Sequence, residues 1–292
     1  MLLTGVNGFT GHYLAEQLIK KGYGVVGTGK GTCRLSLTEE NFIYQSLDIT
    51  SDDEVQQVFN KYQPDTVIHS AAMTKPDECE LNNEAAYLVN VTGTSYLLRA
   101  SSKLHSHFVY VSTDFIFGGN KEIYNEEDEG SPVNYYGKTK LLAEAEVKCY
   151  GDDWNIVRTS LVYGHPKSGR QNILTNVAAA LQKGQVLNMY HDQRRKPTYV
   201  EDLAKGIVRM IERRAKGIYH FSGEDILTPY EMACATADYL GLNKRLINAV
   251  TAETFKQPAF RPAQTIFDLS KAKADLGYES ISFEEGLRKT FE

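Results

Sequence analysis

The sequence predicts an α/β fold: a Rossmann-type doubly wound parallel sheet with a smaller C-terminal α/β lobe. Short apolar runs alternate with helical patterns along the first 160 residues, which indicates a parallel sheet with helices on both faces. The runs are continuous rather than alternating, as is typical of strands that are buried on both faces. A glycine-rich turn follows the first run and opens the first helix, at a position where this fold binds ligands.

Each element is predicted from its apolar pattern and from the turn residues that flank it. The helix expected from residue 51 begins with Thr50-Ser51-Asp52-Asp53-Glu54, which is a capping and dipole signature. The expected strands are residues 1–4, 23–28, 41–46, 66–71, 108–112, 155–160 and 217–221. The expected helices are residues 10–21, 51–61, 85–103, 136–147, 172–183, 201–213, 229–240 and 283–291.

The alternation of strands and helices thins after residue 160, which predicts a change of architecture. We expect residues 1–160, together with 201–222, to form the Rossmann domain that binds a dinucleotide. Residues 161–200 and 223–292 are expected to form the smaller lobe, which would bind the substrate.

The bulk composition is that of an ordinary globular protein. Of the 292 residues, 42% are hydrophobic and 24% are charged, and the formal net charge is −5. This mildly acidic balance, without a basic tract, argues against nucleic-acid binding. No apolar stretch approaches the roughly 18 residues that a membrane helix needs. The four cysteines are widely spaced and no secretory segment is visible, so we expect free thiols and a cytoplasmic protein.

The glycine turn predicts a dinucleotide site. The run Thr4-Gly5-Val6-Asn7-Gly8-Phe9-Thr10-Gly11 places glycines three residues apart between a strand and a helix. Glycine permits a tight turn and the close approach of a pyrophosphate, and the helix N-terminus supplies unpaired N–H groups. The spacing departs from the G-x-G-x-x-G fingerprint, and the alternative is a turn that binds nothing. We expect cofactor contacts from Gly5, Asn7, Gly8, Phe9 and Gly11.

The segment after the second strand favours NADP(H) over NAD(H), which stays the alternative cofactor. An NAD enzyme usually has an acidic residue there for the ribose 2′-hydroxyl, and none occurs before Glu39. Lys30 and Arg34 are placed to meet a 2′-phosphate, unless both are solvated loop cations. Asp48 is expected either to bind the adenine or to cap the next helix. Further cofactor contacts are expected from Ile49, Ser70, Ala71 and Ala72.

Tyr136 and Lys140 are the predicted catalytic pair. Their spacing puts both on one face of a helix, and a nearby ammonium lowers the pKa of a phenol, which is about 10 when free. Tyr136 is therefore a candidate general acid for a carbonyl oxygen that receives hydride. Ser112 and Thr113 end the fifth strand, and either hydroxyl can orient the same oxygen. The alternative for an isolated Y-x-x-x-K is a surface pair.

The chain resembles the extended short-chain dehydrogenases and, within them, the dTDP-4-dehydrorhamnose reductases. The resemblance covers nearly the whole chain, and two of its motifs, 113–115 and 158–160, point to the reductase branch rather than to sugar epimerases. A departure is Arg194-Arg195-Lys196, where the family tends to have a less basic stretch. The motifs are Thr4-Gly5…Gly8…Gly11, residues 69–74, 90–94, 112–117, 132–140 and 158–164, Asp192-Gln193…Pro197-Thr198, and Arg261-Pro262.

The resemblance implies NADPH-dependent reduction of the 4-keto group of a nucleotide-linked 6-deoxy sugar, from dTDP-4-dehydrorhamnose to dTDP-L-rhamnose. It implies that Thr113, Tyr136 and Lys140 carry catalysis. It further implies that Asn90 belongs to the cofactor site and helps to hold its geometry.

The resemblance also implies the substrate contacts. By likeness to sugar-nucleotide enzymes, Arg195 and Arg261 would grip the diphosphate, for which two guanidinium groups are chemically suited. Thr74, Ser112 and Asn172 are the other expected substrate contacts.

Two other functions stay open. A nucleotide-sugar epimerase or dehydratase would keep NAD bound, and the missing acid after the second strand argues against it. A non-catalytic NADP-binding regulatory subunit, like the β subunit of methionine adenosyltransferase, resembles the same reductases, and the intact catalytic residues argue against it. No metal is expected, because His105 and His107 have no cysteine or carboxylate close by in the sequence. The expected partners are a nucleotide sugar and a second copy of the chain in a homodimer.

Overall fold

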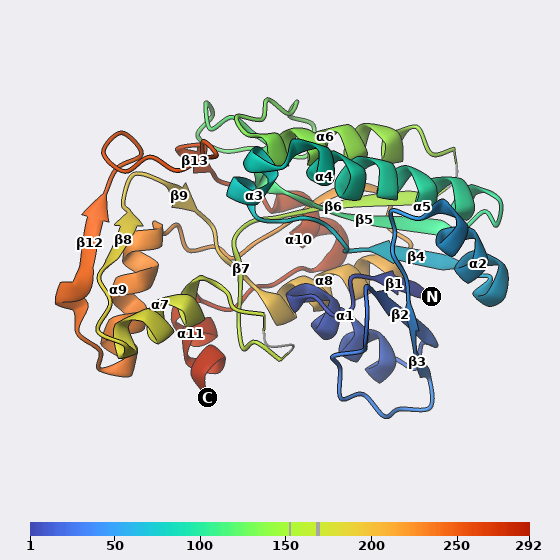
Figure 1. Cartoon of the computed structure of the whole chain (residues 1–292), viewed down its shortest axis with the longest axis horizontal. Coiled ribbons are helices and arrows are strands. Elements are labelled where there is room, and N and C mark those ends of the chain that lie inside the picture. Colours follow the sequence, from blue (N-terminus) through green and yellow to red (C-terminus); the bar gives the residue numbers. More distant parts are fainter. Residues whose placement is uncertain (152, 168–169) are drawn as a thin grey trace.

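A parallel sheet forms the centre of the computed structural model, which describes residues 1–151, 153–167 and 170–292. Within these ranges the sheet has seven strands in the order β11-β6-β5-β4-β1-β2-β3 (Figure 1). The direction of winding reverses between β1 and β4, so a crevice is expected outside their carboxyl ends. The strands are β1 (Leu2–Thr4), β2 (Val25–Gly29), β3 (Phe42–Ser46), β4 (Thr66–His69), β5 (His107–Thr113), β6 (Trp154–Thr159) and β11 (Gly217–Phe221).

Helices cover both faces of this sheet (Figure 1). Each face has its own cluster of buried apolar side chains, which explains why the strand segments are apolar without alternation. One face carries α1 (Phe9–Lys20), α8 (Val200–Glu212) and α10 (Ser270–Leu276). The other carries α2 (Asp52–Tyr62), α5 (Gly93–Ser102) and α6 (Tyr135–Lys148).

The predicted fold class is confirmed, but one predicted helix is interrupted. The expected helix 85–103 consists of α4 (Asn83–Tyr87), a π-helical turn η1 (Leu88–Thr92) and α5. Such a turn disturbs the regular helical period and is frequent at functional sites. The short helices α3 (Pro76–Leu81) and α10 were not expected, because six or seven residues are too few to show a helical period.

A smaller α/β region lies beside the sheet (Figure 1). Its strands β8 (Leu187–Tyr190) and β12 (Ile247–Val250) pair in parallel, and its helices α7 (Ile173–Gln182) and α9 (Pro229–Leu240) pack together over a separate apolar cluster. The remaining elements here are α11 (Phe283–Phe291), the pair β7 (Val162–Tyr163) with β10 (Thr198–Tyr199), and the pair β9 (Arg194–Arg195) with β13 (Gln264–Thr265).

We propose the division of the chain into residues 1–160 with 201–222 and residues 161–200 with 223–292. The pairing of β11 with β6 supports the return of 201–222 to the main sheet. However, α10 lies in the second range and packs against α8 and β11 of the main sheet. The two regions therefore share the segment around α10.

The composition also led to expectations about cysteines and membrane spans. Among the described residues, Cys33, Cys79, Cys149 and Cys234 are free thiols. The described ranges contain no helix that is long and apolar enough to cross a membrane.

Candidate active site

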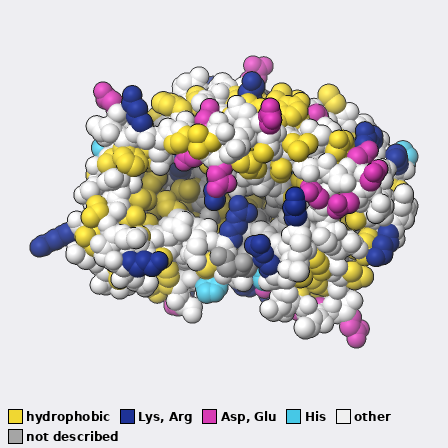
Figure 2. All heavy atoms as spheres, viewed as in Figure 1, with side chains coloured by type: hydrophobic (Ala, Val, Ile, Leu, Met, Phe, Trp, Pro, Cys, Tyr) yellow, Lys and Arg dark blue, Asp and Glu magenta, His cyan; other side chains and the backbone are white. Residues whose placement is uncertain are grey.

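A cavity of about 1110 Å³ opens between the carboxyl ends of the strands and the smaller region. Figure 2 shows that this face is hollowed near its centre, with Lys and Arg side chains around the hollow. The volume is at the upper end for ligand pockets, which suits a dinucleotide and a second ligand together. Of the predicted site residues it is lined by Gly5, Asn7, Gly8, Phe9, Lys30, Arg34, Asp48, Ile49, Ser70, Ala71, Ala72, Thr74, Ser112, Thr113, Tyr136, Lys140, Asn172, Arg195 and Arg261.

The glycine turn brings the N-terminus of α1 to this cavity. Gly5 has a φ of +72°, and a Cβ there would lie 2.7 Å from the backbone nitrogen of Ala71. Gly11 does not line the cavity; a Cβ there would lie 2.2 Å from the carbonyl oxygen of Gly5, so it allows the helix to pack on the turn. Among the described residues no side chain caps α1, and its first turn has no acidic residue. Its N–H groups can therefore meet an anion.

The loop after β2 carries the cations expected at a 2′-phosphate. Lys30 forms a salt bridge of 2.7 Å with Asp48, and the hydrogen bond from Lys30 lowers the pKa of the Asp48 carboxyl. Arg34 lines the cavity, and its backbone N–H donates to the side chain of Asn7 at 2.9 Å. Asn7 thus holds the loop in place. Asp48 does not cap the next helix, since the N-cap of α2 is Ser51.

The predicted catalytic side chains come together in the cavity. Thr113 is the last residue of β5, and Tyr136 lies in the first turn of α6, which Asn134 caps by accepting a hydrogen bond from the Gly137 N–H at 2.8 Å. Lys140 follows one turn later on the same helix. Thr113, Tyr136 and Lys140 therefore all line this cavity.

The electrostatics of the pair differ from the expectation. Burial raises the pKa of Tyr136, and a hydrogen bond with Thr113 opposes that rise only in part. Lys140 is also buried; its Nζ donates to the Val111 carbonyl at 2.7 Å and lies 4.0 Å from the ring centre of Tyr110. Burial lowers the pKa of Lys140 to about 7. The ammonium is thus itself destabilised, because low-dielectric surroundings disfavour either charged form.

The hydroxyl of Ser112 is held in place by one member of a buried ion pair. Its hydroxyl donates to Glu144 of α6 at 2.6 Å. Glu144 and Arg158 of β6, which are 0% and 1% exposed, form a salt bridge of 2.8 Å. This hydroxyl is therefore engaged within the protein, although Ser112 also lines the cavity.

Asn90, in the π-helical turn, lies outside the cavity lining. Its side-chain amide accepts from the Met73 N–H at 2.8 Å and donates to the Met73 carbonyl and to Thr139 Oγ1, both at 3.0 Å. Asn90 therefore joins the strand-end loop that contains Met73 to α6, beside Lys140. A direct contact with the cofactor stays a prediction.

Asn172 and Thr74 lie where the smaller region meets the cavity. Asn172 caps α7 with a reciprocal capping box and donates to the Gly164 carbonyl at 2.7 Å, so its amide is largely satisfied. Thr74 Oγ1 accepts a hydrogen bond of 3.1 Å from Arg170. Sequence reasoning missed Arg170, since neither a motif nor a periodic pattern singles it out.

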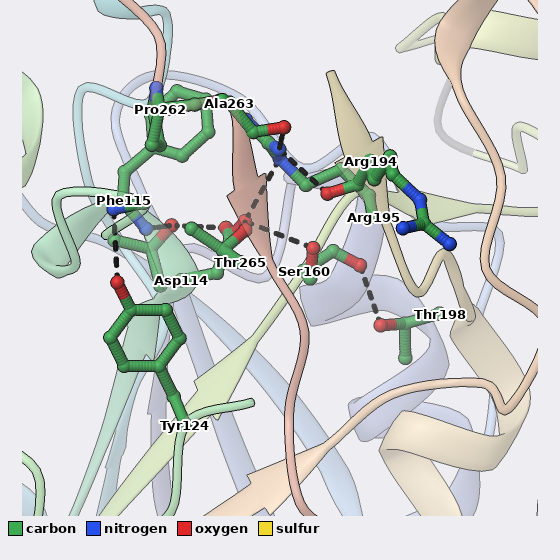
Figure 3. Close-up of polar contacts among 12 residues, drawn as sticks. Asp114, Phe115, Tyr124, Ser160, Arg194, Arg195, Thr198, Pro262, Ala263 and Thr265 are labelled. Carbon is green, nitrogen blue, oxygen red and sulfur yellow. Dashed lines mark hydrogen bonds and ion pairs between the residues drawn. The ribbon is translucent and has the colours of Figure 1, made fainter. Parts of the chain in front are cut away.

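The two arginines expected at a diphosphate are already paired. Arg261 forms two hydrogen bonds with the carboxylate of Asp77 in α3, at 3.1 and 2.8 Å, and lies at the cavity edge. Arg195 is 4% exposed and contacts Asp114, which sequence reasoning did not assign to the site (Figure 3). Both arginines pair with aspartates that are far away in the sequence, so the residues around each arginine do not reveal its partner.

The fold and the site define a class of protein. A doubly wound sheet with a glycine turn at β1, a hydroxyl at the end of β5 and a Tyr/Lys helix belongs to an NAD(P)-dependent oxidoreductase of the extended short-chain dehydrogenase type. The chain belongs to the family described as RmlD substrate binding domain, whose model matches residues 1–292.

Individual relatives are similar along the full chain. The spore coat polysaccharide biosynthesis protein SpsK of Bacillus subtilis is 32% identical over 99% of this chain and 95% of its own length. The β subunit of methionine adenosyltransferase 2 from Xenopus tropicalis is 31% identical over 99% and 86%. A solved dTDP-4-dehydrorhamnose reductase from Bacillus anthracis, in complex with NADP, is 30% identical with a TM-score of 0.85 and covers 99% of this chain and 97% of that chain.

Proposed function

We propose that the protein reduces the 4-keto group of a nucleotide-linked 6-deoxy sugar with NADPH, forming dTDP-L-rhamnose from dTDP-4-dehydrorhamnose. The observation that carries this proposal is that Thr113, Tyr136 and Lys140 line one cavity together with the N-terminus of α1. The similar reductase that was solved with NADP supports the same reaction class and cofactor.

The residues around the glycine turn fit NADPH. The uncapped N-terminus of α1 suits a pyrophosphate, and Lys30 and Arg34 suit a 2′-phosphate. When bound, NADPH supplies the hydride that reduces the keto carbon. The small residues Ala71 and Ala72 leave room along the strand ends, and the buried Lys140 amine is placed to donate to a ribose hydroxyl.

Tyr136 would donate its phenolic proton to the oxygen of the substrate carbonyl as that oxygen gains negative charge. Thr113, whose hydroxyl proton is directed at Asp114, would contact the Tyr136 phenol and hold it beside that oxygen. The ammonium form of Lys140 would favour the phenolate that remains, and solvent would return the proton to Tyr136.

We propose Arg170 and Arg261 as the contacts of the substrate diphosphate. Arg170 lines the cavity, is exposed, and has the neutral Thr74 hydroxyl as its partner among the described residues. Its positive charge also acts to lower the pKa of Tyr136. Arg195, in contrast to Arg170, is enclosed by protein groups and would not reach a ligand without losing them.

The test is to add NADPH and dTDP-4-dehydrorhamnose to the purified protein and to follow NADPH absorbance and the sugar product. We expect NADPH consumption with one dTDP-L-rhamnose formed for each NADPH. In Tyr136→Phe, kcat should fall by about 100-fold or more, because the proton donor is lost, while NADPH still binds. Tyr135→Phe is the matched control and should retain turnover. Near-normal turnover in Tyr136→Phe would exclude Tyr136 as the donor.

A second candidate function is a regulatory NADP-binding subunit, which the similarity to the β subunit of methionine adenosyltransferase 2 favours. It predicts NADPH binding without consumption for any keto sugar. An epimerase or dehydratase would instead keep NAD through purification, and the absence of an acidic residue between Val25 and Glu39 disfavours it.

A further inference from the structure

A buried carboxylate lies directly behind the proposed catalytic threonine. Asp114 follows Thr113 and is 3% exposed. Its Oδ1 accepts a hydrogen bond of 3.1 Å from the Thr113 hydroxyl. Its Oδ2 accepts from the hydroxyls of Ser160, at 3.0 Å, and Thr265, and lies 3.3 Å from Arg195 Nε (Figure 3). Both carboxylate oxygens are therefore occupied by donors from the protein.

Arg195 connects this carboxylate to the smaller region. Its guanidinium donates to the backbone carbonyls of Pro262, at 2.7 Å, and of Arg194, at 2.8 Å, with a longer bond to Ala263. Pro262 directly follows Arg261, the predicted substrate contact at the cavity edge. The ion pair and these hydrogen bonds together join Asp114, which directly follows β5, to the segment that contains Arg261. Figure 3 shows Asp114, Arg195 and Pro262 of this connection.

We propose that Asp114 and Arg195 are positioning residues that direct the hydroxyl of Thr113 and hold the Arg261 segment at the reaction centre. The Thr113 hydroxyl accepts from the Phe115 N–H at 3.2 Å and donates to Asp114, so its rotation is set from both sides. An ionised Asp114 can only accept, and therefore fixes the direction of the Thr113 proton. A protonated Asp114 becomes a donor itself and removes that constraint.

The charge of Asp114 depends on Arg195. Burial raises the pKa of Asp114, and the positive charge of Arg195 is the main opposing influence, aided by hydrogen bonds from Thr265, Ser160 and Thr113. From α6, Tyr136 faces the same carboxylate, whose negative charge raises the Tyr136 pKa. Without Arg195, Asp114 should protonate at a higher pH, and Thr113 should lose its direction as the pH falls.

The kinetic test rests on the proposed reductase function and compares Arg195→Met, Arg195→Lys and Arg194→Met. Arg194 is a matched control because its side chain is exposed on the same strand. In Arg195→Met, kcat should fall about 10-fold or more at the acidic end of the pH range and recover as the pH rises. Arg195→Lys keeps the positive charge but not the bonds to the carbonyls, so its ratio to the parent should change less with pH, whereas Arg194→Met should follow the parent. Lys140 also titrates near neutrality, so the measured quantity is the ratio of variant to parent kcat. A ratio that does not change with pH would overturn the proposal.

A second measurement needs no turnover. In the ligand-free protein, ¹³C NMR follows the Asp114 carboxyl, assigned with Asp114→Asn, and the Thr113 methyl group, assigned with Thr113→Ser. In Arg195→Met the two signals should change with the same titration midpoint, and this midpoint should lie at a higher pH than in the parent. A Thr113 signal that does not change while Asp114 titrates would refute the coupling.

If Arg195→Met does not fold, Thr265→Val should raise the titration midpoint by a smaller amount. An unchanged midpoint in that variant would overturn the proposal. A parent protein that reduces no keto sugar would defeat the proposed function alone, because the NMR result stands apart from it.

Discussion

At the scale of single residues, burial controls the chemistry of Tyr136 and Lys140. Both side chains lie in low-dielectric surroundings, so the pKa of the phenol is raised and the pKa of the amine is lowered to about 7. Spacing in the sequence places the two groups on one helix face, but it does not reveal how deeply they are buried.

The lowered pKa of Lys140 makes a prediction about stability. Below about pH 7 the folded protein carries a buried ammonium, which is a cost that disappears as the pH rises toward the unfolded value of 10.5. Lys140→Met should therefore be more stable than the parent near pH 6, and this advantage should shrink by about 2–3 kcal/mol by pH 9. Urea unfolding at both pH values measures it, with the exposed Lys138→Met as control. An advantage that grows with pH would contradict the assignment.

The sequence predicted some site residues better than others, for a physical reason. Thr113, Tyr136 and Lys140 follow from a strand end and a helical spacing, which are local patterns. The contacts of Arg195 and Arg261 are with Asp114 and Asp77, far away in the sequence. Local patterns cannot show such pairs, and the substrate role that the family resemblance gives to these two arginines stays a prediction.

At the scale of elements, α1 depends on the close packing of its first turn on the β1 turn. A Cβ at Gly11 would lie 2.2 Å from the Gly5 carbonyl oxygen and 2.8 Å from its carbon, both of which are backbone atoms. Gly11→Ala should push the N-terminus of α1 from its place, weaken NADPH binding about 10-fold or more, and lower stability by about 1–3 kcal/mol. Calorimetric titration measures the affinity. In Gly24→Ala, where the added Cβ meets no described atom within 4 Å, binding should stay unchanged.

Helix α6 is anchored to the sheet by the buried pair of Glu144 and Arg158. Arg158→Met leaves the carboxylate unpaired in the interior, and we expect the free energy of unfolding to fall by about 3–5 kcal/mol. The double change Arg158→Met with Glu144→Met removes both charges and should recover much of this loss. Chemical denaturation of the two variants is the measurement. Equal stability of the single and double variants would show that the pair does not behave as a buried charge pair.

Elements with a clear pattern were predictable, and the others were not. The strands of the main sheet are apolar runs bounded by turn residues, and they form where expected. The strands β7, β9, β10 and β13 have two residues each, too few for any periodic signal. In the π-helical turn, the Asn90 side chain bonds the Met73 backbone and Thr139 Oγ1, which are distant in the sequence, so no local pattern could reveal these contacts.

At the scale of the whole molecule, the site lies where the main sheet and the smaller region meet. The cavity is lined by the glycine turn and the predicted catalytic side chains from the sheet and its helices, and by Arg170, Asn172 and Tyr190 from the smaller region. The loss of alternation after residue 160 predicts a division of the chain there, which stays a prediction, and it does not reveal that α10 packs against the main sheet.

The central claim is that hydride passes from NADPH to C4 of a nucleotide-linked keto sugar. The direct measurement uses NADPH deuterated at the transferable position, dTDP-4-dehydrorhamnose and NMR of the sugar product. We predict one deuterium at C4 of the sugar, transferred from only one of the two faces of the nicotinamide, with Tyr136→Phe strongly slowed. A product without deuterium at C4, or a sugar that remains unreduced while NADPH stays bound, would contradict the claim.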